Sequence, residues 1–201
     1  MYAGGMTSRP DPTSRFIVTD VEALRVLSHP LRARILGVLR LEGEANASQL
    51  GRRLAESSGA TSYHLRQLAR FGFVEESEHQ GSRRERVWRA RHALTTIDPL
   101  RFTSGVDWEV LDEVSALQLG RVVEQSERWI RRRAQASPEW ASAAGFSDDV
   151  VRLTPAACAE LHERLIALLA GLEADSGQQP GAQWVSVFLA ALPQTDEEAV
   201  S

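Results

Sequence analysis

Lysine is absent from this sequence of 201 residues, and cysteine occurs only once. All 23 basic residues are therefore arginine, a bias to which we give no mechanistic weight. The lone Cys158 excludes an intrachain disulfide and any metal site built from several cysteines. We expect this thiol to behave as a small apolar side chain on a buried helix face.

The sequence also lacks any apolar run long enough to cross a bilayer, and its polar segment 1–15 has no signal-peptide core. We therefore expect a cytoplasmic protein without membrane contacts. A phosphate loop, a nucleophile elbow and a paired histidine-carboxylate motif are missing as well. These absences predict a protein that is not an enzyme and that uses no metal and no cofactor.

Charge is divided unevenly along the chain. Residues 20–92 hold 13 arginines and 9 acidic residues, a net charge of +4. Residues 93–201 hold 8 arginines and 17 acidic residues, a net charge of −9. The first half can face nucleic acid, whereas the second half should not.

The most informative stretch is SSGATSYHLRQLARFGF, residues 57–73, which predicts a short turn followed by an amphipathic helix. One face of this helix carries Leu65 and Leu68 together with Thr61 and His64. We expect His64 to pack inward, while packing and DNA contact are both open for Thr61. The other face has hydrogen-bond donors and no carboxylate, as a helix against DNA requires, although a solvated surface has the same composition.

The neighbouring segments place this helix in a recognisable order. Amphipathic helices are predicted at 20–27, 30–41 and 47–54, and the tight turn at 57–59 makes the last of these the first half of a helix-turn-helix. An extended segment follows from residue 73, and its return strand carries several arginines beyond a Gly81 tip. The pattern predicts a β-hairpin with a basic tip.

Together these residues resemble the arsenical-resistance-repressor (ArsR) family of winged helix-turn-helix transcription regulators. The resemblance is carried by LSHPLRARILGVL (27–39), ASQLGRRLAESSGATSYHLRQLARFGFVEE (47–76) and QGSRRERVW (80–88). It implies that the helix containing SYHLRQL is the recognition helix and that the hairpin is the wing. The resemblance and the donor-rich helix face together give the predicted DNA-binding residues: Ser48, Arg52, Ser58, Thr61, Ser62, Tyr63, Arg66, Gln67, Arg70, Arg83, Arg84 and Arg86.

The second half of the sequence predicts a long helix over 106–136, with an apolar stripe too broad for a single contact. We expect this stripe to serve as the interface of a homodimer through Val110, Leu111, Val114, Leu117, Val122 and Trp129. A further helix begins near residue 155, and the extended segments 150–153 and 184–192 are predicted to pair as a two-stranded sheet.

The sequence thus predicts an α+β, mainly helical protein. Its parts are a disordered tail (1–15), a winged helix-turn-helix domain (16–98), a dimerisation region (99–193) and an acidic tail (194–201). We expect a homodimeric repressor that binds double-stranded operator DNA. Two alternatives stay open. One is a winged helix that binds a protein. The other is a small-molecule-responsive regulator or binding protein whose ligand pocket lies in the C-terminal region. Its lining would be Trp108, Trp129, Trp140 and Trp184, which can equally be core and interface anchors.

Overall fold

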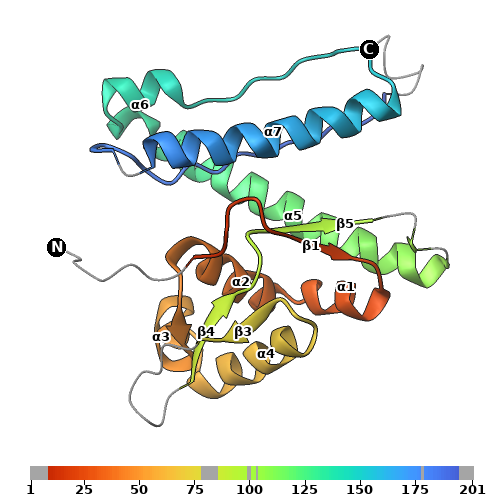
Figure 1. Ribbon diagram of the computed structural model, residues 1–201. Helices are drawn as coiled ribbons and strands as arrows, with labels where there is room; N and C mark the ends of the chain where they lie inside the picture. Colours follow the sequence, from red (N-terminus) through yellow and green to blue (C-terminus); the bar gives the residue numbers. More distant parts are fainter. Residues whose placement is uncertain (1–8, 78–85, 99–100, 103, 178, 195–201) are drawn as a thin grey trace. The chain divides into compact units, whose positions relative to one another are not determined.

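A computed structural model describes residues 9–77, 86–98, 101–102, 104–177 and 179–194. The chain divides into two compact units, Met1–Arg121 and Val122–Ser201. Figure 1 shows the elements of both units along the chain. The fold is mixed and mainly helical with small sheets, as the sequence predicts.

Among its described residues, the first unit contains four short helices, two small sheets and the start of a long helix. Its elements in chain order are β1 (Arg15–Val18), α1 (Val21–Leu27), α2 (Pro30–Glu42), β2 (Ala45–Asn46), α3 (Ala47–Leu54), α4 (Ser58–Arg70), β3 (Val74–Glu76), β4 (Val87–Ala90), β5 (Leu94–Ile97) and the N-terminal part of α5 (Gly105–Arg132).

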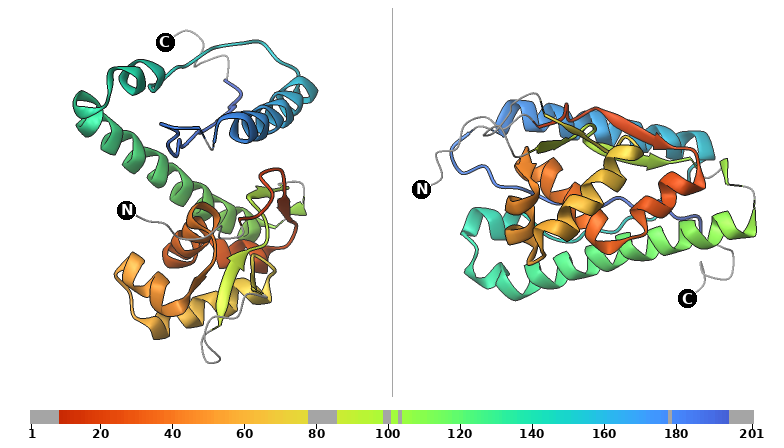
Figure 2. Two further views of the ribbon diagram at one scale, coloured as in Figure 1. Left: turned by 60° about the vertical axis from the view of Figure 1, so that its left-hand side comes forward. Right: turned by 90° about the horizontal axis from the view of Figure 1, so that it is seen from below.

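One sheet has three strands in the order β2-β4-β3, with both pairs antiparallel. Strands β3 and β4 are the two arms of the predicted hairpin, whose tip lies outside the described residues. Figure 2 shows this sheet lying beside α4. Strand β3 is the element that follows α4 in the chain, so the hairpin begins just after that helix ends.

The other sheet is a parallel pair, β1 with β5, in which Phe16 lies opposite Thr95. The pairing begins before β1, because the Ser14 hydroxyl and carbonyl accept hydrogen bonds from the Ala93 and Leu94 amides, both at 3.0 Å. Residues 9–15 thus differ from the disordered tail predicted for 1–15. The remainder of that predicted tail, residues 1–8, lies outside the described residues.

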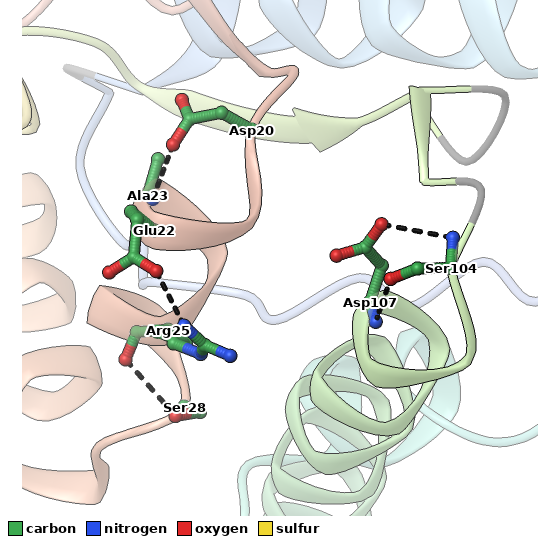
Figure 3. Close-up of polar contacts among 7 residues, drawn as sticks. All are labelled: Asp20, Glu22, Ala23, Arg25, Ser28, Ser104 and Asp107. Carbon is green, nitrogen blue, oxygen red and sulfur yellow. Dashed lines mark hydrogen bonds and ion pairs between the residues drawn. The ribbon is translucent and has the colours of Figure 1, made fainter.

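Side-chain caps fix where the helices begin (Figure 3). The Asp20 carboxylate accepts a 2.8 Å hydrogen bond from the Ala23 amide at the start of α1. At the start of α5, the Ser104 amide donates to the Asp107 carboxylate and the Asp107 amide donates to the Ser104 hydroxyl. Such caps satisfy amide donors that the first turn of a helix leaves free.

The core of the first unit brings together apolar side chains from every helix of this unit and from its sheets. Phe73, Leu24, Ile35, Leu39, Leu50, Leu65 and Leu68 are the largest of those that are fully buried. Burial of each such side chain contributes about 1.5–3 kcal/mol relative to exposure. The apolar face predicted for the helix at 57–73 is thus a core face.

A half-buried arginine, Arg40, joins α2 to β5 and to the segment that leads into it. The Arg40 Nε donates to the His92 carbonyl at 2.9 Å, and its Nη2 donates to the Thr95 hydroxyl at 2.6 Å. Burial, with a smaller contribution from Arg121, lowers the pKa of Arg40 to about 10. The side chain remains a cation at neutral pH and is held by neutral acceptors.

The second unit contains the end of α5, the 3-10 helix η2 (Arg133–Gln135), α6 (Pro138–Ala143) and α7 (Pro155–Ser176). Thr154 caps α7 by accepting from the Ala157 amide at 3.2 Å, as the sequence predicts. The predicted sheet of this half is wrong, because segments 150–153 and 184–192 contain no strand. The Val150 side chain is 80% exposed, so the β-branched composition of 150–153 has no partner strand to pack against in the described chain.

Candidate nucleic-acid interface

Helix α4 has a buried face and an outward face. Thr61, His64, Leu65 and Leu68 are buried, as the helical periodicity predicts. The outward face carries six of the predicted DNA-binding side chains, of which Tyr63 is 52% exposed. The six are Ser58, Ser62, Tyr63, Arg66, Gln67 and Arg70.

This outward face is electropositive because nothing on α4 opposes its arginines. The helix contains no acidic residue. Within the described part of the chain, Arg66 and Arg70 have no ion pair, and Arg70 instead lies over the Phe71 ring at 5.6 Å. Unpaired guanidinium groups beside hydroxyl and amide donors can bind phosphate oxygens and base edges without first giving up an acidic partner.

The turn between α3 and α4 is tight and is set by backbone geometry. Ala55 adopts a left-handed conformation with φ 57°, and the Glu56 amide donates to the Gly51 carbonyl at 2.8 Å. A Cβ at Gly51 would lie 2.8 Å from the Glu56 carbonyl oxygen, so only glycine allows this close approach. The Ser57 hydroxyl then caps α4 by accepting from the Ala60 amide at 3.1 Å.

Thr61 of α4 is fully buried, and its hydroxyl contacts helix α3. Its hydroxyl lies 2.7 Å from the Ala47 carbonyl at the start of α3 and 3.1 Å from each of the Ser57 and Ser58 carbonyls. This side chain has no surface to offer to DNA. Of the two roles that the sequence left open, the structure places Thr61 in packing, and we remove it from the predicted DNA-binding set.

His64 also points into the domain, as expected. Its ring lies 4.4 Å from the His29 ring and 5.1 Å from the Tyr63 ring, measured between centroids. Burial lowers the pKa of His64, and the nearby His29 and Arg32 lower it further. The neutral imidazole thus packs beneath Tyr63 and supports the outward position of that side chain.

The predicted residues of α3 lie near its two ends. Ser48 is half-buried in the first turn, whereas Arg52 is exposed and has no ion pair within the described chain. Its neighbour Arg53 pairs with Glu42 at 2.8 Å. The ion pair of Arg53 agrees with its omission from the predicted DNA-binding set, which includes Arg52.

Residues 27–77, which include both helices and their turn, match a family described as a helix-turn-helix domain. This chain contains a helix-turn-helix domain. In DNA-binding domains of this kind the second helix enters the major groove, which indicates that the protein is a DNA-binding regulator.

Two further comparisons were made with the whole chain. A search of the curated proteins finds no match. Among solved structures, the chain is similar to RV1404 from Mycobacterium tuberculosis, with 20% identity and a TM-score of 0.31 over 81% of this chain and 86% of that chain.

The hairpin beyond the helix-turn-helix pair carries arginines that are bound to acidic residues. Arg86 pairs with Glu76 at 2.9 Å, and Arg89 and Arg91 both pair with Glu75, at 2.9 and 3.2 Å. Arg86 would have to leave Glu76 before it could bind a phosphate. The predicted tip residues Arg83 and Arg84 lie outside the described residues.

The six apolar residues of α5 predicted to form a dimer interface do not share one environment. Val110 and Val114 are buried in the core of the first unit, and Leu111 packs against that core. Leu117, Val122 and Trp129 are half-buried. Val110 and Val114 are already covered by their own chain, so they cannot form an interface with a second copy. The exposed large apolar side chains of α5 are instead Val106, Trp108, Leu119, Val123 and Ile130.

Two arginines outside the predicted DNA-binding set lie close to the outward face of α4. Arg25 of α1 and Arg32 of α2 line a hollow together with Gln67 and Arg70. In the sequence these two arginines contribute only to the net charge, because no local pattern marks a site shared by three helices.

No group of three or more histidine, cysteine, aspartate or glutamate side chains in the described part of the chain is placed to hold a metal ion. Among the described helices, none combines the length and the apolar character needed to span a membrane.

Proposed function

We propose that this protein is a sequence-specific transcription regulator that binds double-stranded DNA as a homodimer and acts as a repressor. The observation that carries the proposal is the outward face of α4, which combines donors, exposed Tyr63 and unpaired Arg66 and Arg70 without any carboxylate. In this proposal α4 lies in the major groove, with Ser62, Tyr63 and Gln67 toward base edges.

The proposal places the protein among winged helix-turn-helix regulators of the ArsR type, which its sequence resembles. The antiparallel pair β3 and β4, following α4 directly, supports the assignment of a wing. The wing would bring Arg83 and Arg84 to the DNA backbone beside the groove that α4 occupies. Arg86, with its acidic partner, would contribute less.

The homodimer is supported by apolar surface that the second unit leaves uncovered. None of its described residues is buried, and Leu161, Leu168 and Leu172 of α7 are each more than 40% exposed. Monomeric proteins seldom expose this much apolar surface, so we propose a second copy of the chain as its cover. A twofold dimer would place two α4 helices about one DNA turn apart on a palindromic operator.

We further propose that regulation needs no metal and that the protein has no enzymatic activity. The sequence supports this through its single cysteine and its lack of any recognised catalytic motif. Titration with Zn²⁺ tests the first part: it should not change the affinity for the operator. Tight stoichiometric binding coupled to a change in DNA affinity would overturn it.

Selection of bound fragments from a random DNA pool tests the main proposal and supplies the operator. We expect an enriched palindrome with half-sites about 10 base pairs apart. Ser62→Ala and Tyr63→Phe should relax discrimination at particular base pairs, whereas Arg66→Gln should weaken binding to all sequences. Arg53→Gln, which removes an arginine already paired with Glu42, is the matched control. Failure of the wild-type protein to enrich any sequence would contradict the proposal.

A hollow in the second unit supports a second candidate function, the binding of a small effector. It has a volume of about 430 Å³ and is lined by Trp129, Arg133 and Phe146 with small residues around them. Trp108, Trp140 and Trp184 do not line it, so the predicted pocket of four tryptophans does not form there. A planar ligand with an acidic group would suit an aromatic wall beside a guanidinium. Quenching of tryptophan fluorescence by aromatic carboxylates, lost in Trp129→Leu, tests this candidate.

A further inference from the structure

A second hollow lies in the first unit, beside the outward face of α4. Its volume is about 360 Å³, and residues from α1, α2 and α4 line it. Three of them are arginines, Arg25, Arg32 and Arg70, and one is acidic, Glu22. Gln67, a predicted DNA-binding residue, adds an amide group to the same wall. The hollow therefore joins the α4 surface to the two helices that precede the helix-turn-helix pair.

The charges around this hollow are not balanced. Arg25 donates to the Glu22 carboxylate one turn before it on α1, as Figure 3 shows. Arg32 and Arg70 have no ion pair within the described chain. Two positive charges thus remain uncompensated around one concave surface, and such a surface attracts anions.

The Arg32 guanidinium is held in place yet retains an unused donor. Its Nη2 donates to the Arg25 carbonyl at 3.0 Å, which fixes the end of the side chain. Its Nε is buried and has no hydrogen-bond partner among the residues that the structure describes. A buried donor without an acceptor is unfavourable, and the planar fork of an arginine matches two oxygens of a phosphate or carboxylate group.

We propose that this hollow binds an oxyanion of the phosphate type, held by Arg32 and Arg70, which have no ion pair within the described chain, beside the Glu22-paired Arg25. The anion can be a phosphate group of the DNA backbone, in which case the inference rests on the proposed function and extends the DNA interface from α4 to α1 and α2. It can also be a free phosphate-bearing ligand, because the volume exceeds that of one phosphate group. The chemistry of recognition is the same in both cases.

Two substitutions with opposite expected effects test the proposal. Arg32→Gln removes one of the uncompensated charges, and Glu22→Gln removes the carboxylate that competes with an incoming anion. Arg53 lies outside the hollow, and Arg53→Gln removes the same net charge as Arg32→Gln, so it serves as the control. Circular dichroism of all the variants checks that they fold. The opposite signs keep the test valid even where Arg32→Gln weakens folding, because a purely structural role predicts no gain from Glu22→Gln.

The first arm measures affinity for the selected DNA at several salt concentrations. If the anion is a DNA phosphate, Arg32→Gln weakens binding by roughly tenfold. It also flattens the slope of log affinity against log salt by about one unit. Glu22→Gln strengthens binding, and Arg53→Gln leaves the slope unchanged.

The second arm follows titration of the protein alone with inorganic phosphate by nuclear magnetic resonance. If the anion is a free ligand, phosphate shifts the signals of residues around the hollow, and Arg32→Gln abolishes the shifts while the salt slope for DNA stays as in the wild type. If neither arm shows an effect of Arg32→Gln, the proposal is overturned. If wild-type protein binds no DNA, the proposed function fails, and the phosphate titration still decides whether the hollow is an anion site.

Discussion

Replacing Thr61 with valine separates a packing role from a DNA-contact role at the one predicted interface residue that the structure buries. Valine keeps the branched shape and removes the hydroxyl, which lies 2.7 Å from the Ala47 carbonyl. A buried hydrogen bond contributes about 0.5–1.5 kcal/mol, and leaving an acceptor unsatisfied costs about 1–3 kcal/mol. The Ala47 carbonyl begins helix α3 and keeps its helical bond, so we expect a loss of about 1–2 kcal/mol.

Urea unfolding followed by circular dichroism measures this loss. With a slope of about 1–3 kcal/mol per molar urea, the midpoint should fall by roughly 0.3–2 M. At a temperature where Thr61→Val is still folded, its affinity and base discrimination for the operator should match those of the wild type. Ser62→Ala, one residue away on the outward face, should show the reverse: an unchanged midpoint and relaxed discrimination. If Thr61→Val altered base discrimination without moving the midpoint, Thr61 would face DNA and the packing assignment would be refuted.

Three further predictions concern the stability of the helix-turn-helix domain. Ala55→Gly should raise the unfolding free energy by about 0.5–1 kcal/mol, because glycine relieves the left-handed strain at φ 57° at some entropic cost; a lower urea midpoint would contradict this. Asn46→Ala removes a capping box shared with Gln49 at the start of α3 and should lower the free energy of unfolding by about 0.5–2 kcal/mol, which the urea midpoint reports. Asn46→Asp should retain most of that stability, because aspartate also caps helices. Burial lowers the pKa of both His64 and His92, so the unfolded chain takes up protons first as the pH falls below about 6.5; the melting temperature should drop between pH 7.5 and 5.5, and less so in His64→Gln.

The helix-turn-helix pair could be predicted from sequence because its signals are local. Leu65 and Leu68 mark the buried face of α4 by periodicity, and a polar cap before each helix marks its start. The same periodicity predicts that Thr61 lies on the inward face of α4, but only its contact with the Ala47 carbonyl decides between packing and DNA binding. That contact joins residues 14 positions apart, beyond the reach of a single-helix pattern.

The features that could not be predicted depend on partners distant in sequence. The pairing of β1 with β5 joins Arg15 to Leu94, and neither four-residue strand carries a signal for the other. In the opposite direction, the β-branched segment at 150–153 indicated a strand, but a strand needs a partner, and none of the described segments pairs with it. Helix α5 shows a third case: periodicity found its apolar stripe but could not tell that Val110 and Val114 face their own core.

The salt dependence of DNA binding should reflect only those arginines that have no acidic partner in the free protein. Residues 20–92 contain 13 arginines, and a count of charge alone treats them as equal. Within the described residues, six pair with acidic residues and Arg40 donates to His92 and Thr95. These seven cannot bind phosphate without losing existing contacts: Arg25, Arg34, Arg40, Arg53, Arg86, Arg89 and Arg91. Arg32, Arg52, Arg66 and Arg70 have no ion pair within the described chain.

Each phosphate neutralised adds about 0.9 to the slope of log affinity against log salt. The four unpaired arginines predict a slope of about −3.6 per protomer, and about −5.4 if Arg83 and Arg84 of the hairpin also reach the backbone, against about −12 for all 13. Measuring operator affinity between 50 and 200 mM NaCl, roughly the range over which this effect is large, distinguishes these values. A slope near −12 per protomer would mean that the ion pairs with Glu22, Glu42, Glu56, Glu75 and Glu76 open on binding, and the interface would then extend well beyond the outward face of α4.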